Sequence, residues 1–370
     1  MEGVASTLFP GWGMVGILAL VVAALLLCVR LHWPPFRRTR RSQQSDSSPS
    51  ANDELQAELA PRVPARMLGL AVSAGCRPAQ SSAAGGDFYD VFAPARGKVA
   101  VILGDVAGRG PLALRHAAST RTTLRAYVQA GVEPRAALAL AGRVLATPTV
   151  EHLATAVVGV YDTRSGCLTF ASAGHQPPLL HGLHTREPVN VCASAPIGWS
   201  APTGRRQTTV SLPAGAVACF FSDGLVEARC KHGVLGRERL STMLGSLGAR
   251  PSAAKLLAQV QAAACSIRDD LAACILVSEL AVLTPQVHVE ELEVDAEGLD
   301  GERARLFLET CQLRGAELEQ TLEQAAETTA TWGAAVLRVQ IASSGPSATV
   351  LAPMREPQMT GALVSQTIRH

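Results

Sequence analysis

The stretch GGDFYDVFAPARGKVAVILGDVAGRG, residues 85–110, decides the fold of this chain. Its apolar run over residues 99–103 is bounded by glycines, which predicts a buried strand. Asp87 lies ahead of this strand and Asp105 follows it, each directly after a glycine. Glycine lets backbone and carboxylate approach a common point, as hard divalent cations such as Mg2+ require of their oxygen ligands. The stretch therefore predicts carboxylates gathered at the end of a sheet.

Further aspartates recur in the same setting along the chain. Asp223 follows an apolar run over residues 216–221, and Asp269 and Asp270 precede another over residues 271–278. Like charges in one cleft are unfavourable unless cations neutralise them. Two divalent ions about 3.5–4 Å apart would do so and would activate a water for hydrolysis of a phosphoester. Any one of these aspartates, taken alone, is better interpreted as a turn or cap residue.

The order of predicted elements indicates the fold class. Strands are predicted over residues 67–74 and 99–103, helices over 111–131 and 133–146, strands over 153–161, 167–171 and 216–221, helices over 237–247 and 252–264, and a strand over 271–278. Strands followed by paired helices and then by further strands are typical of an α+β fold with antiparallel sheets, not of alternating β-α units.

Six ordered motifs resemble one family of enzymes: GGDFYD, GDVAGRG, ATAVVGVYD, SAGHQPPLL, FFSDGLVEA and DDLAACILV. They are similar to the SpoIIE-like, stress-and-sporulation branch of the metal-dependent (PPM, type 2C-like) serine/threonine protein phosphatases, over roughly residues 54–279. The resemblance implies an αββα sandwich with two Mn2+ or Mg2+ ions between its sheets. It also implies that an activated water hydrolyses phosphoserine or phosphothreonine without a covalent enzyme intermediate.

The resemblance assigns roles to individual residues. The residues it implies as metal ligands are Asp87, Asp105, Val106 (through its backbone carbonyl), Asp223 and Asp269. Asp105 is expected to bridge both ions, and Asp87 and Asp105 are expected to carry the catalysis through the activated water. Asp270 and Gly86 are expected to contact and support these ligands, and Asp90 fits such a supporting position and a polar surface position equally well.

Three other residues near the motifs bear on activity. Ala272 stands where the family commonly has threonine, but the change removes no ligand, so we expect activity to survive. His175, in a Gly-His-Gln-Pro-Pro turn, is interpreted as stabilising the turn, with a catalytic acid as the alternative. Arg109 fits a contact to the substrate phosphate and a solvated surface position equally well.

The N-terminal segment, residues 1–33, predicts a membrane anchor. Its core MVGILALVVAALLLCV, residues 14–29, carries no charge, and a helix of about 20 apolar residues spans a bilayer. Arginines follow in the Pro-, Ser- and Arg-rich linker over residues 34–52. Because the side of a membrane span that carries arginine stays in the cytoplasm, the chain after the span is expected to be cytoplasmic. A cleaved signal peptide fits poorly because no basic region precedes the apolar run. We expect a single-pass protein of the cell membrane, with its N-terminus outside and its catalytic domain in the cytoplasm.

The anchor and linker lead into a phosphatase domain predicted over residues 53–282, which begins with a short lead-in helix over 53–60. A tail over residues 287–354 weakly resembles the first half of the histidine-kinase-like ATPase fold. Its Glu323 and Glu327 stand where that fold has a Glu-x-x-x-Asn box, and no glycine-rich phosphate cradle follows. We interpret the tail as a degenerate α/β remnant, followed by a disordered segment over 355–370.

Composition excludes some function classes. The net charge of +2 offers no basic field for nucleic acid. None of the nine cysteines forms a CxxC pair, which favours reduced thiols over a zinc site. The partner implied by the resemblance is a phosphoprotein like an anti-sigma-factor antagonist, and a homodimer is a further possibility. The alternative to an enzyme is an inactive scaffold that keeps the phosphatase fold and recruits partners.

Overall fold

The computed structural model describes residues 59–78, 85–146, 153–183, 194–199, 201–279, 286–300 and 302–353. Four predicted segments lie outside the described residues, in whole or nearly so: the anchor over 1–33, the linker over 34–52, the lead-in helix over 53–60 and the tail end over 355–370. In the part that the structure describes, no helix combines the length and the apolar character needed to cross a membrane.

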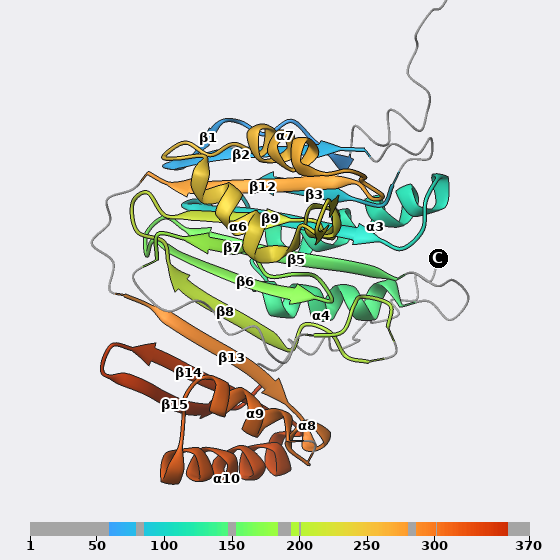
Figure 1. Cartoon of the computed structure of the whole chain (residues 1–370). Coiled ribbons are helices and arrows are strands. Elements are labelled where there is room, and N and C mark those ends of the chain that lie inside the picture. The colour runs from blue at the N-terminus through green and yellow to red at the C-terminus, as the bar shows by residue number, and fades with distance from the viewer. Residues whose placement is uncertain are drawn as a thin grey trace, which may run out of the picture. The chain divides into compact units, whose positions relative to one another are not determined.

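Two antiparallel sheets form the frame of the fold (Figure 1). The five-stranded sheet has the order β1 (Arg66–Met67), β2 (Leu70–Arg77), β12 (Leu271–Ser278), β9 (Val217–Phe221) and β7 (Leu179–His181). The eight-stranded sheet has the order β15 (Gly345–Leu351), β14 (Ala335–Ala342), β13 (His288–Val294), β8 (Arg206–Ser211), β6 (Cys167–Ala173), β5 (Ala154–Asp162), β4 (Lys98–Val106) and β3 (Phe88–Phe92). A small hairpin joins β10 (Arg229–Cys230) to β11 (Gly233–Val234).

Helices cover the outer faces of the two sheets. The helices α3 (Pro111–Gln129) and α4 (Pro134–Leu145) pack on the eight-stranded sheet, and α6 (Gly236–Ser246) and α7 (Ala253–Ala263) pack on the five-stranded sheet next to the short α5 (Asp223–Glu227). A third apolar cluster fills the space between the sheets. Strand β4 is buried on both faces: Val101 faces the other sheet and Ile102 faces the helices. This explains the unbroken apolar run that predicted it.

The predicted α+β class with antiparallel sheets is confirmed. Strand β12 has the predicted bounds, and the predicted strands over 153–161 and 167–171 pair with each other as β5 and β6. Strand β8 was not predicted, because its sequence RQTTVS lacks the apolar alternation of a half-buried strand. Every cysteine in the described ranges is a free thiol, in keeping with the prediction of a reduced protein.

The tail contributes strands to the phosphatase sheet. Strand β13 pairs with β8 on one side and with β14 on the other, so the eight-stranded sheet is continuous across the tail. The helices α8 (Ala296–Asp300), α9 (Arg303–Thr310) and α10 (Gly315–Trp332) belong to this part, and residues of β13, β14, α9 and α10 form an apolar cluster of their own. The tail was predicted to begin at residue 287, but the pairing of its first strand with β8 was not predicted.

Candidate active site

Asp105 lies near the end of β4, in the eight-stranded sheet. The buried strand carries its half-buried side chain to the edge of the sheet where β5 begins, and Asp105 stands opposite Thr155 in the antiparallel pair. The carboxylate predicted from the glycine-flanked strand is therefore at a strand end, as expected.

Asp223 and Asp269 come from the five-stranded sheet. Asp223 is the first residue of α5, just after β9, and Asp269 lies just before β12. Strands β9 and β12 are antiparallel, with Phe221 opposite Ala273. The residues that follow β9 therefore lie beside the residues that precede β12, which brings these two aspartates together.

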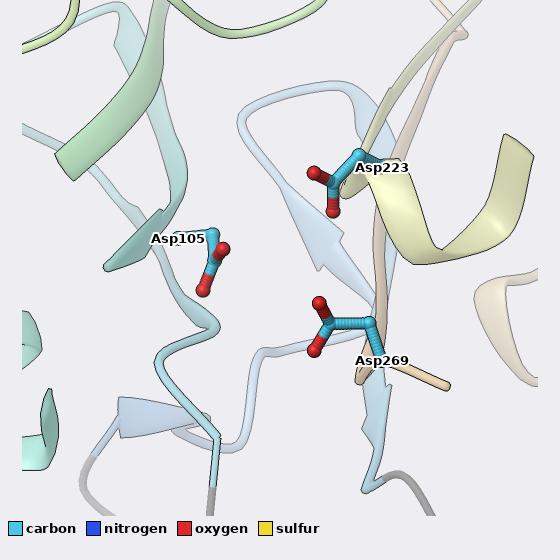
Figure 2. Close-up of side chains that lie close together, drawn as sticks. All are labelled: Asp105, Asp223 and Asp269. Atoms are coloured by element: carbon cyan, nitrogen blue, oxygen red, sulfur yellow. The ribbon is translucent and has the colours of Figure 1, made fainter. Parts of the chain in front are cut away.

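The three carboxylates point toward one another (Figure 2). One oxygen of each of Asp105, Asp223 and Asp269 lies within 4.8 Å of the other two. One sheet supplies the first of these side chains and the other sheet supplies the second and third. The cluster therefore occupies the place where the strand ends of the two sheets meet.

Asp87 lies beside this cluster without being part of it. It precedes β3, is almost fully buried, and its Oδ2 has no hydrogen-bond partner. Burial raises the pKa of the Asp87 carboxyl well above its usual range, and the charge of Asp105 adds to the rise. Its position next to Asp105 agrees with the predicted grouping of the two residues.

Gly86 allows the segment before β3 to pass against the end of β4. A Cβ on Gly86 would collide with the Val106 carbonyl oxygen and would lie 2.8 Å from an Asp105 carboxylate oxygen. The Val106 amide donates to the Gly86 carbonyl over 3.3 Å. Only glycine fits at this crossing, and it leaves the Val106 carbonyl close to the carboxylates.

The electrostatics of the cluster fit a bound cation. Burial first, and then the charges of Asp223 and Asp269, raise the pKa of Asp105 to about 7. Burial also raises the pKa of Asp223, whose Oδ1 is buried without a partner. Oxygen-rich, mutually repelling carboxylates with unsatisfied atoms are the donors that Mg2+ and Mn2+ prefer. The residues present therefore suit a divalent metal.

Asp270 supports the site through the backbone. The Ser222 hydroxyl donates to the Asp270 carbonyl over 3.3 Å and accepts from the Ala272 amide over 2.9 Å. The Asp270 side chain is buried against Gly85, where a Cβ would collide with its carboxylate. These contacts hold the turn that carries Asp269, which agrees with the supporting role predicted for Asp270.

The structure does not bring Asp90 to the cluster, so the support predicted from it is corrected. Side chains alternate along a strand, and Asp90 points to the helix-covered face of β3. There it pairs with Arg121 at 3.0 Å and with Arg125 at 2.7 Å, both on α3. Asp90 is thus a buried ion-pair partner of α3. Asp90 lies three residues after Asp87, so in an extended chain their side chains point to opposite faces.

Arg109 reaches the edge of the cluster from the loop between β4 and α3. Its Nη2 donates to the Arg268 carbonyl over 2.5 Å and lies 3.1 Å from Asp269 Oδ1, and about a third of its side chain is exposed. The glycines on either side, Gly108 and Gly110, both have positive φ. Both sequence interpretations of Arg109 overlooked this ion pair with Asp269.

Thr155 was not predicted to take part in the site, and His175 was interpreted as stabilising its turn, with a catalytic acid as the alternative. The Thr155 hydroxyl hydrogen-bonds the His175 ring over 2.8 Å, next to the cluster. One feature of the sequence could have indicated a role for Thr155. It lies at the start of the strand ATAVVGVYD, which pairs with β4, the strand that carries Asp105.

Comparison with known proteins gives a family for the domain that contains Asp105, Asp223 and Asp269. Residues 95–278 match the family model described as Stage II sporulation protein E (SpoIIE). Among similar solved structures is the PP2C phosphatase domain of SpoIIE from Bacillus subtilis, with 19% identity, a TM-score of 0.49, and a match covering 56% of this chain and 63% of that chain.

Two further structures are similar over more of this chain. The RsbU and RsbW domains of a Mycobacterium tuberculosis protein match with 21% identity and a TM-score of 0.48, over 75% of this chain and 85% of that one. The SiaA-PP2C domain of Pseudomonas aeruginosa matches with 20% identity and a TM-score of 0.46, over 72% of this chain and 99% of that one.

The α+β fold and the family match together define a phosphatase domain of the PP2C type. Residues 95–278 therefore form a domain of the SpoIIE family of phosphatases.

Proposed function

We propose that this chain is a membrane-tethered phosphatase that uses two Mn2+ or Mg2+ ions to hydrolyse phosphoserine or phosphothreonine on a regulatory protein. The observation that carries the chemistry is the convergence of Asp105, Asp223 and Asp269 beside the buried Asp87. Membership of the SpoIIE family supports a regulatory phosphoprotein as the substrate. The sequence resemblance favours a phosphorylated antagonist of an anti-sigma factor.

The residues that would hold the metals follow from the geometry of the cluster. Asp105 faces both Asp223 and Asp269, so it is the side chain best placed to serve two ions. The Val106 carbonyl and Asp87 lie on the side of Asp105 nearest β3. When bound, the ions supply a water of lowered pKa and offset the charge of the transferring phosphoryl group.

The side chains of the site favour direct attack of water on the phosphate over a covalent intermediate on serine. Ser222 is the hydroxyl nearest the cluster in sequence, but it is fully buried and bonded to backbone groups of Asp270 and Ala272. The sequence around Ser222 also lacks the pattern of a base and an orienting group that a nucleophilic serine requires. The carboxylates therefore orient a water, and the phosphoryl group moves to that water without a covalent enzyme intermediate.

His175 does not supply the proton to the leaving group in this proposal. Both of its ring nitrogens are engaged by protein groups, and burial lowers its pKa to about 4, so the ring is neutral near pH 7. A general acid works best with a pKa near the operating pH and within reach of the reacting atoms. This argues against the catalytic acid and leaves protonation of the leaving group to solvent.

The membrane tether rests on residues 14–29 and the arginines that follow, which lie outside the described residues. It places the catalytic domain at the cytoplasmic face of the cell membrane. Protease protection of the full chain in sealed vesicles tests this: the catalytic domain should be digested only from the cytoplasmic side. Recovery of the full chain in the soluble fraction would contradict the tether.

Phosphatase chemistry is tested with the full chain in detergent. Hydrolysis of p-nitrophenyl phosphate and of a phosphoserine peptide should require Mn2+ or Mg2+ and stop when the metal is chelated. Asp105→Asn should lower kcat by at least about 100-fold, because it removes the charge that faces both ions. Asp162→Asn is the matched control: Asp162 caps a turn at the far end of the β4–β5 pair and should leave kcat unchanged. A wild-type kcat in the Asp105→Asn variant would contradict the proposal. So would a wild-type chain that hydrolyses neither substrate with metal present.

A further inference from the structure

A buried histidine connects the two sheets beside the cluster. The Nδ1 atom of His175 lies 2.8 Å from the Thr155 hydroxyl, on β5 of the eight-stranded sheet. Its Nε2 atom lies 3.0 Å from the Phe221 carbonyl, on β9 of the five-stranded sheet. The imidazole thus bridges two sheets whose described strands are not hydrogen-bonded to each other.

The partners determine which nitrogen carries the proton. A carbonyl oxygen only accepts, so Nε2 of His175 donates to Phe221. The neutral ring then accepts at Nδ1, and the Thr155 hydroxyl is the donor there. Burial favours the neutral ring and lowers its pKa. Both hydrogen bonds can therefore be present together near neutral pH.

Each end of this bridge adjoins a candidate metal ligand. Thr155 stands opposite Asp105 in the β4–β5 pair. Phe221 is the last residue of β9, two positions before Asp223. The bridge therefore spans from the strand that carries one carboxylate to the strand that carries the other.

The loop that carries His175 is itself fixed. The Gly174 amide donates to the Ser194 carbonyl over 2.8 Å. The Arg237 guanidinium donates to the Pro177 and Pro178 carbonyls over 2.8 and 2.9 Å. A side chain on a loop held at both ends can hold its partners in place.

We propose that His175 is a positioning residue: its bridge from Thr155 to Phe221 sets the separation of Asp105 and Asp223 and so tunes the affinity of the cluster for divalent cations. The inference rests on the proposed function, because it concerns the same metal site. It assigns His175 no contact with metal or substrate.

The cleanest test removes one hydroxyl. Thr155→Val deletes the donor to His175 without changing the size of the side chain, and Thr155→Ser keeps it. In the full chain, calorimetric titration with Mn2+ should give a Kd about 10-fold weaker or more for Thr155→Val, since loss of a supporting hydrogen bond typically costs 10–100-fold in metal affinity. Thr155→Ser should bind as the wild type does. Equal Kd for Thr155→Val and wild type would overturn the proposal.

Variants of the ring extend the test. His175→Phe removes both hydrogen bonds and should weaken Mn2+ binding more than Thr155→Val does. His175→Gln keeps a donor for Phe221 and should fall between them. Combining Thr155→Val with His175→Phe should add little, because both changes break one connected unit. Full additivity would contradict the bridge, and Thr155→Val still decides the question if His175→Phe does not fold.

The matched control is another histidine with a similar bond. His181 Nε2 lies 2.8 Å from the Ser241 hydroxyl, between β7 and α6. His181→Gln should leave the Kd for Mn2+ unchanged, and a loss equal to that of the His175 variants would show a general stability effect.

Kinetics separate this inference from the proposed function. At saturating Mn2+ the Thr155→Val variant should recover most of its kcat with KM unchanged. A wild-type chain that binds no Mn2+ would overturn both proposals. An active wild type whose Kd for Mn2+ is unchanged in Thr155→Val would overturn only this one.

Discussion

The Arg109 guanidinium lies 3.1 Å from Asp269 Oδ1, so an arginine and any cation bound by the cluster share one carboxylate. Both side chains are partly exposed, which limits the strength of the pair. The positive charge of Arg109 opposes a second positive charge nearby. We therefore expect Arg109, in the loop between β4 and α3, to lower the affinity of the cluster for cations.

From this relationship we predict the effect of Arg109→Gln on metal binding. Removing the competing charge should tighten Mn2+ binding by about twofold to fivefold, as expected for a partly exposed pair worth 0.2–1 kcal/mol. The KM for a phosphopeptide should rise if Arg109 also contacts the phosphate. Calorimetric titration and steady-state kinetics measure the two effects separately. Weaker metal binding in Arg109→Gln would contradict the competition.

Gly86→Ala should damage both the fold and the metal site. Its Cβ would collide with the Val106 carbonyl, and forcing atoms into a packed site costs about 1–3 kcal/mol. We expect a lower midpoint in urea unfolding and a weaker Kd for Mn2+. Gly75→Ala in β2 is the control, because its Cβ would meet only ordinary contacts at 3.5 Å. Similar losses in both variants would count against a specific role for Gly86.

His175 should make the protein less stable in mild acid. Burial lowers its pKa to about 4 in the folded chain, below the usual value of 6.5, so the unfolded chain binds the proton more tightly. Stability from this residue is present above about pH 6.5 and is lost as the pH falls toward about 4. By pH 5 the loss is about 2 kcal/mol.

The measurement compares wild type with His175→Gln by urea unfolding at pH 7 and pH 5. Asp87 and Asp105 have raised pKa values, that of Asp105 being about 7, so they act in the opposite direction. Because they are present in both proteins, the difference between the two isolates the histidine. A difference independent of pH would refute the assignment.

A buried ion pair joins β8 to β13. Glu290, on β13, is fully buried and accepts from Arg206 over 2.9 Å and from Thr208 over 2.7 Å. It also lies 2.8 Å from His288 Nε2. Glu290→Gln would remove the negative charge that Arg206 contacts in the interior, so it should cost about 3–5 kcal/mol of unfolding free energy.

Urea unfolding checks this prediction, with Glu319→Gln as the control. Glu319 pairs with Arg305 on the surface of the tail, where loss of the charge should make no measurable difference. Replacing both Arg206 and Glu290 by apolar residues should cost less than Glu290→Gln alone, because no buried charge is then left unpaired. A harmless Glu290→Gln would mean that this pair does not stabilise the junction.

Much of the phosphatase domain could be predicted from local sequence. Strands such as β4 and β12 are buried on both faces, so they are apolar throughout and stand out in the sequence. Strand β8 could not be found in this way, because its polar side chains are satisfied by charged partners on β13, which is distant in the sequence. The ion pairs of Asp90 could not be predicted either, because no local signal identifies the arginines of α3 as its partners.

The sequence by itself determined which residues bear the carboxylates, which strands deliver them, and the family to which the domain belongs, because strand periodicity and motif order are local properties of the chain. Only the tertiary structure decided that Asp105 meets Asp223 and Asp269, that Asp90 turns away, and that His175 joins the two sheets. These outcomes depend on strand register and on packing between sheets. Both are set by contacts between residues far apart in the chain, which no local pattern records.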